Sequence, residues 1–113
     1  MRVYVPATLG TLAEFVARGQ VPSGDRFLAE EESEEAEYAA LTAAADAAAT
    51  LLDGTGRRVV VVADVPDADA AFPMSLVAAV HADTEPVDAR DPDLPDLGWF
   101  AVQEIADLLR ISG

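Results

Sequence analysis

The sequence predicts an α/β fold: a small single domain over residues 1–113, in which a three- or four-stranded mixed sheet is covered by about three helices. The chain has 113 residues, 51% of them hydrophobic, and a chain of this length buries about two-thirds of its unfolded surface around one core. Residues 59–63 form an unbroken apolar run, typical of a strand buried on both faces. Segments with helical periodicity lie between the expected strands. We therefore expect right-handed crossovers and a sheet that is at least partly parallel.

The first elements are a strand and a helix. The strand is expected over residues 2–5 and ends at Pro6, because proline has no backbone N–H to donate. The helix follows, with Thr8 as its N-cap and Gly19 as its left-handed C-cap. Residues 26–29 are expected to form a second, short strand.

The longest predicted helix covers residues 33–52. Alanine dominates it; this residue has the highest helix propensity, and its small side chain allows close approach to a sheet. The expected buried stripe has helical spacing and consists of Tyr38, Leu41, Ala45, Ala48 and Leu52. The glycine-containing residues 54–58 precede a strand instead of opening a helix, so we interpret them as a helix end and turn and not as a phosphate-binding loop.

In the second half of the chain, residues 59–63 are the expected central strand and residues 75–82 the next strand. If these two strands pair antiparallel, the sheet is mixed. After a surface loop, residues 97–110 are expected to form an amphipathic helix. Trp99 and Phe100 are adjacent in it and cannot share one helix face. One of them is expected to be partly exposed, and both are candidate partner-binding residues.

Charge and composition limit the classes of function. Seven arginines and no lysine stand against 21 acidic residues, for a net charge of -14. Direct nucleic-acid binding is therefore not expected, whereas a basic protein partner fits the sign of the charge. The absence of cysteine excludes cysteine-ligated metals and thiol chemistry and favours a cytoplasmic location. No membrane association is expected, because no apolar run approaches the ~20 residues of a spanning helix and the first residues do not resemble a secretory signal.

The sharpest candidate site combines the single histidine with nearby aspartates. We consider Asp64, Asp67 and Asp83 as metal ligands, with Asp69 beside them, and His81 as a general base. Asp64 follows the central strand, and ligands of open α/β sheets bind beyond the carboxyl ends of strands. Such carboxylates suit Mg²⁺ or another divalent cation. Asp64 meets His81 and Asp83 only if their strands run parallel. The structural alternative is that these are loop aspartates beside prolines and a histidine at a strand end.

Several segments together carry a family resemblance: residues 1–9, 37–41, 57–61, 63–66 and 77–81, and Trp99-Phe100 with Glu104. They resemble a family of small acidic actinobacterial proteins of unknown function, and the similarity spans nearly the whole chain. The resemblance implies a single cytoplasmic α/β domain. It implies no activity.

Two hypotheses of function follow. The first is a non-catalytic protein-interaction or regulatory module, favoured by the acidic charge, the lack of a convincing catalytic constellation and an aromatic residue expected to be partly exposed on the last helix. The second is a small divalent-metal-dependent enzyme that acts on a phosphorylated or nucleotide substrate through Asp64, His81 and Asp83. A structure that separates Asp64 from His81 by more than about 10 Å excludes this second hypothesis, because ligands and base must meet around one ion.

Overall fold

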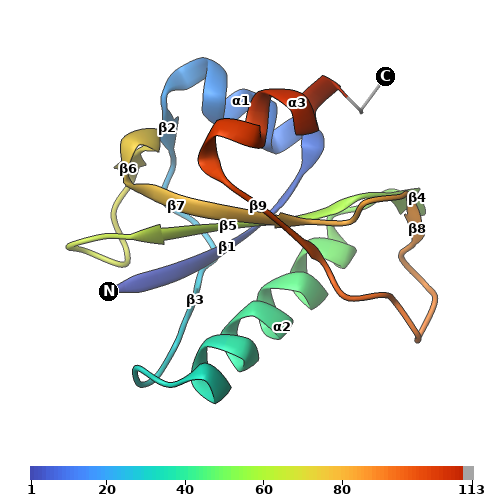
Figure 1. Ribbon diagram of the computed structural model, residues 1–113, viewed down its shortest axis with the longest axis horizontal. Helices are drawn as coiled ribbons and strands as arrows, with labels where there is room; N and C mark the ends of the chain where they lie inside the picture. The colour runs from blue at the N-terminus through green and yellow to red at the C-terminus, as the bar shows by residue number, and fades with distance from the viewer. Residues whose placement is uncertain (111–113) are drawn as a thin grey trace.

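The centre of the molecule is a five-stranded sheet with the strand order β3-β1-β5-β7-β9 (Figure 1), seen in a computed structural model that describes residues 1–110. The strands are β1 (Arg2–Thr8), β3 (Phe27–Leu28), β5 (Arg58–Asp64), β7 (Val77–Ala82) and β9 (Gly98–Phe100). Two small ribbons lie outside this sheet. One pairs β2 (Gln20–Val21) with β6 (Phe72–Pro73), and the other pairs β4 (Thr55–Gly56) with β8 (Val87–Asp88). The predicted α/β class is confirmed, as is the central place of residues 59–63 within β5.

The strand directions differ from the prediction, because every pairing in the five-stranded sheet is antiparallel. Two helices and the short strands β2, β3 and β4 lie between β1 and β5 along the chain. The chain enters β5 at the end where β1 finishes, and Thr8 therefore lies opposite Arg58. Between β5 and β7 the chain has only β6 and a short 3₁₀ turn, η1 (Met74–Leu76). A parallel pairing needs a long crossover. The expectation of a partly parallel sheet is therefore wrong.

The helices cover both faces of the sheet. The helices α1 (Leu9–Arg18) and α3 (Ile105–Arg110) lie on one face, and α2 (Glu34–Thr50) lies on the other (Figure 1). The predicted caps are confirmed: Thr8 Oγ1 accepts a hydrogen bond from Thr11 N, and Gly19 has a φ of 68° at the end of α1. Ser33 Oγ likewise accepts from Ala36 N at the start of α2.

The two faces of the sheet carry separate cores, because successive strand residues point to opposite sides. On the face of α1 and α3, strand residues such as Val5, Val61 and Val80 pack with Leu12 and Leu108. On the face of α2, the core consists of Tyr4, Val60 and Val62 with Ala40, Ala44 and Ala45. The alanines bring α2 close to the sheet, whereas Tyr38 of the predicted stripe is 61% exposed. Within the described residues, no helix is long and apolar enough to cross a membrane.

The first strand continues through Pro6, where the sequence predicted its end. In an antiparallel ladder, hydrogen-bonded and non-hydrogen-bonded pairs alternate along the strands. Asp83 N donates to Arg58 O, so the backbone of Arg58 faces β7 and the backbone of the next residue, Val59, faces β1. This alternation turns the backbone of Ala7 toward β5 and the backbone of Pro6 away from it. On that outer side β3 reaches only Val3 and Tyr4. The proline therefore costs no ladder hydrogen bond.

The helix predicted over residues 97–110 is wrong in its first half. Residues 98–100 are strand β9, followed by a 3₁₀ turn, η2 (Val102–Glu104), and only then by α3. As neighbours on a strand, Trp99 and Phe100 point to opposite faces. Trp99 is exposed beside α2, whereas Phe100 is half-buried and packs against the core of α1 and α3.

Candidate functional site

The face of the sheet under α2 is only partly covered. The helix packs against β1, β3 and β5 and leaves β7 and β9 open on this side. The opening is a groove of about 700 Å³ between α2, the two open strands and the loop that leads into β9. Leu41, Ala45 and Leu97 contribute its apolar surface. A groove of this size is in the range that binds small molecules or side chains of a partner.

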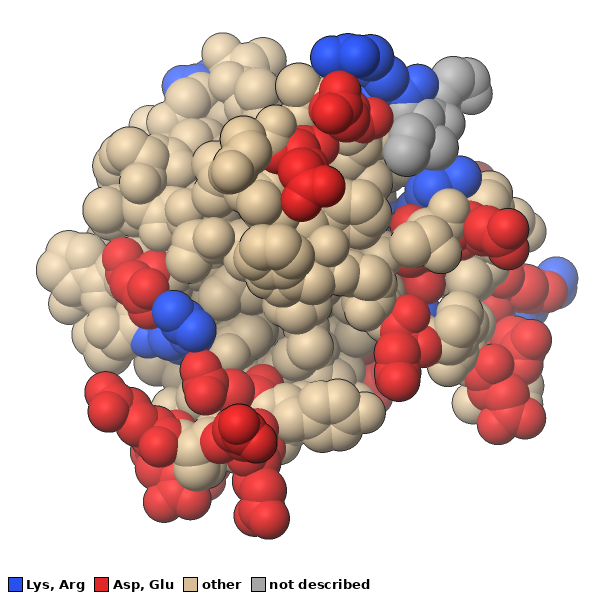
Figure 2. All heavy atoms as spheres, in the orientation of Figure 1, with Lys and Arg blue, Asp and Glu red and all other residues tan. Residues whose placement is uncertain are grey.

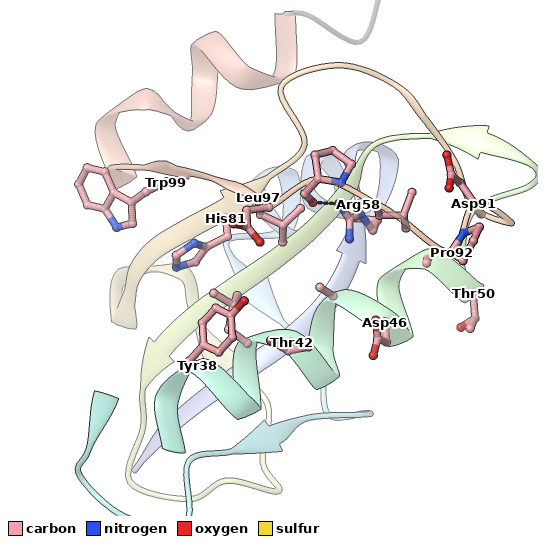
Figure 3. A pocket seen from close by; sticks show the side chains of 17 residues that line it. Tyr38, Thr42, Asp46, Thr50, Arg58, His81, Asp91, Pro92, Leu97 and Trp99 are labelled. Carbon is pink, nitrogen blue, oxygen red and sulfur yellow. Dashed lines mark hydrogen bonds between the residues drawn. The ribbon is translucent and has the colours of Figure 1, made fainter. Parts of the chain in front are cut away.

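One end of the groove is aromatic. Tyr38 of α2, His81 of β7 and Trp99 of β9 gather there (Figure 3). Trp99 lies opposite His81 in the β7–β9 pairing, so both side chains stand on the face of α2. Tyr38 and Trp99 are each 61% exposed, which is unusual for large rings in a small protein. Burial lowers the pKa of the half-buried His81, which favours the neutral imidazole.

The charge of the groove is negative. Asp46 of α2 and Asp91 and Asp96 of the loop line it. Within the described residues none of the three carboxylates has a salt-bridge partner. Acidic side chains also surround a largely uncharged centre on the face of the molecule drawn in Figure 2. The groove therefore favours a cationic ligand.

Arg58 is the one arginine among the groove-lining residues, and its charge is already neutralised. Its Nε and Nη2 donate to Asp83 Oδ2 and Oδ1 at 2.9 and 2.6 Å, and its backbone N donates to Oδ2 at 2.8 Å. The two side chains are 5% and 1% exposed. Nη2 also donates to the Pro95 carbonyl at 2.6 Å. The buried pair thus anchors the loop that forms one wall of the groove.

Sequence reasoning did not identify Arg58 as part of the site. A signal was present, because Arg58 is a charged residue directly before an apolar strand and Asp83 directly follows the next strand. A charge in such a position needs a partner of opposite sign. The antiparallel register supplies that partner.

The predicted metal site does not assemble. Asp64 lies at the far end of β5, four residues beyond Val60, and Val60 pairs with His81. At about 3.3 Å per residue, Asp64 is therefore about 13 Å along the strand from the position of His81. Asp83 lies beyond the opposite end of the strand and is bound by Arg58. Asp67 Oδ1 accepts from Asp69 N and closes a loop turn. Within residues 1–110 no cluster of His, Asp or Glu is arranged to hold a metal ion. Asp64, Asp67, Asp83 and His81 are therefore not the ligands and base of one centre.

Asp64 belongs to a second hollow, near the N-terminus, of about 570 Å³. Arg2 Nε and Nη2 donate to Asp64 Oδ1 and Oδ2 at 3.0 and 3.1 Å, and Nη1 donates to Glu37 at 3.3 Å. Hydrogen bonding to Arg2 lowers the pKa of Asp64. The glutamates Glu30, Glu31 and Glu32 line the same hollow. Its charge is thus partly balanced by an arginine of the chain itself.

The fold and the groove define a small α/β protein with an antiparallel five-stranded sheet, one face of which is partly open. Residues 1–109 match the model described as "Family of unknown function (DUF6912)", and the chain belongs to this family. This confirms the resemblance to a family of unknown function. Among curated proteins and among solved structures, no match to the chain is found.

Proposed function

We propose that the chain is a non-catalytic interaction module of the cytoplasm that binds a basic segment of a partner protein in the groove between α2 and β9. The observation that carries this proposal is the combination of exposed rings and unpaired carboxylates in one groove. Trp99 and Tyr38 offer faces to which a guanidinium or ammonium group binds by cation–π attraction. Asp46 and Asp96, which line the same groove, offer charge-assisted acceptors to other basic groups of the segment.

The Arg58–Asp83 ion pair, which carries no net charge, supports the same proposal. Its hydrogen bond to Pro95 holds the loop wall in place before a ligand arrives, which reduces the ordering cost of binding. Because Arg58 is satisfied by Asp83, it does not compete with a ligand for the groove carboxylates. The net effect is a preformed groove with negative charge.

Trp99 is the single tryptophan of the chain, so its fluorescence reports directly on the groove. The test is a fluorescence titration with three decapeptides that alternate Val with Arg, with Ser or with Glu. We expect saturable binding of the Arg peptide alone. Binding is weaker at 0.15 M salt than at 0.02 M, because the Debye length falls to about 8 Å.

Matched charge variants locate the binding site. Asp46→Asn and Asp96→Asn are each expected to weaken binding of the Arg peptide about two- to fivefold, as exposed ion pairs do. Glu14→Gln is the control, since it removes the same charge from α1 on the opposite face of the sheet. An Arg peptide that does not bind at either salt concentration overturns the proposal, and so does equal weakening by all three variants.

A further inference from the structure

We propose that the basic segment binds as a sixth strand, antiparallel to the outer edge of β9, and directs alternate side chains into the groove. This inference rests on the proposed function and adds the mode of binding. Added-strand recognition combines backbone hydrogen bonds, which give affinity, with side-chain pockets at every second residue, which give specificity.

The strand β9 lies at one edge of the sheet. It is the last strand in the sheet order and, within residues 1–110, pairs with β7 only. A strand in this position presents backbone groups that another chain can pair with.

The backbone groups of β9 alternate between facing β7 and facing away from the sheet. Arg58 and Asp83 form a hydrogen-bonded pair, since Asp83 N donates to Arg58 O at 3.1 Å. Alternation along β7 then turns the backbone of Val80 and Ala82 toward β9, where their partners are Phe100 and Gly98. The N–H and C=O of Trp99, between these two partners, therefore point away from the sheet. Apart from the ladder with β7, no backbone–backbone hydrogen bond of these two groups is found within the described part of the chain.

The open edge ends at Ala101, two residues after Trp99. Glu104 Oε1 accepts from Ala101 N at 2.9 Å, and Ala101 O accepts from Glu104 N at 2.9 Å. Both backbone groups of Ala101 are therefore used within the chain. The backbone groups that remain open at this edge thus include those of Trp99, which is also the exposed ring of the groove.

The register of the added strand follows. In an antiparallel hydrogen-bonded pair, the residue opposite Trp99 exchanges both backbone bonds with it and places its side chain on the same face, about 4.5–5.5 Å away. That face is the groove, where the carboxylates lie. A basic side chain at this position lies beside the Trp99 ring and within the field of Asp46 and Asp96. The charge selects a basic segment over a second copy of this chain, whose net charge is -14.

Two N-methylated versions of the Arg-Val decapeptide test the inference. One carries N-methyl groups on its arginines and the other on its valines, so both lose the same number of N–H groups. If arginine pairs with Trp99, methylation of the arginines removes the donor and weakens binding at least tenfold. Methylation of the valines, whose N–H groups point outward, changes binding less than about threefold. Hydrogen exchange of the Trp99 amide is expected to slow when the parent peptide binds.

The outcomes separate the two proposals. If the parent peptide binds and the two methylated versions bind equally, or with the reverse preference, the added strand is overturned while the groove keeps its ligand. An unchanged hydrogen-exchange rate of the Trp99 amide in the complex also overturns the added strand. If the parent peptide does not bind, both proposals fail. Peptide-dependent doubling of the mass in sedimentation, which indicates pairing of two copies, also overturns the added strand.

Discussion

The two ends of β5 carry the same chemical pair in opposite surroundings. At its start Arg58 binds Asp83, with side chains 5% and 1% exposed; at its end Asp64 binds Arg2, with side chains 59% and 43% exposed. Both pairs have two guanidinium donors on two carboxylate oxygens. The first also holds a backbone N–H and the loop at Pro95. Burial, and not the type of pair, therefore decides what an ion pair does in this fold.

The largest expected effect is that of breaking the buried pair. Asp83→Ala leaves the Arg58 guanidinium buried without its counter-charge, and we expect the free energy of unfolding to fall by about 3–5 kcal/mol. Asp64→Ala makes the same chemical change at the exposed end and is expected to cost less than about 1 kcal/mol. Urea unfolding followed by circular dichroism measures both. Equal losses in the two variants would contradict the comparison.

The second prediction concerns replacing the buried pair as a whole. The double variant Arg58→Met, Asp83→Leu contains no unpaired charge, so we expect it to be more stable than Asp83→Ala. It stays about 1–3 kcal/mol below the wild type, because the N–H of residue 58 loses its acceptor. Pro95 also loses its donor, so the loop wall is released and the Trp99 response to the Arg-Val peptide weakens. A double variant that binds the peptide like the wild type would show that the pair does not position the loop.

The third prediction concerns His81, two residues before Asp83 and half-buried in the groove. Its pKa is lowered by burial, so the unfolded chain takes up a proton at a higher pH than the folded chain does. Stability is therefore full above the ordinary histidine pKa of about 6.5 and falls as the pH decreases below it. We expect the wild type to lose more stability between pH 7.5 and 5.5 than His81→Gln does. Urea unfolding at four pH values in this range measures the difference, and parallel curves would disprove the assignment.

The helices α1 and α2 and the strands β1, β5 and β7 were predictable because their signals are local. The Thr8 and Ser33 caps, the alanine-rich helix and the apolar run of β5 depend on neighbouring residues only. The direction of the strands was not predictable in this way, because it depends on how the connections fold back. The prediction of a helix over residues 97–110 failed in its first half for a related reason. Trp99 fits a helical stripe, yet it pairs with His81 of β7 in a strand.

The candidate site was predicted in part. His81 and Trp99 were both identified from the sequence, for different sites, and the antiparallel register brings them together. The same register separates Asp64 from Asp83, so an acidic set that is close in sequence is spread over both ends of the sheet. Arg58 could be recognised only with its partner, which lies 25 residues further along the chain. Long-range pairing therefore decides which of these residues form a site.

The smallest expected effect is that of pH and salt on the exposed pair. Hydrogen bonding to Arg2 lowers the pKa of Asp64, so this pair contributes stability above the ordinary aspartate pKa of about 3.9 and loses it as the pH falls further. The wild type is expected to exceed Asp64→Ala by less than about 1 kcal/mol at pH 7, and the difference to shrink as the pH falls below about 3.9. Raising the salt concentration to 1 M at pH 7 also reduces it, because both side chains face water. The corresponding difference between wild type and Asp83→Ala at pH 7 is expected to persist in 1 M salt, since water and ions do not reach that pair. Equal salt sensitivity at the two ends of β5 would show that burial does not distinguish them.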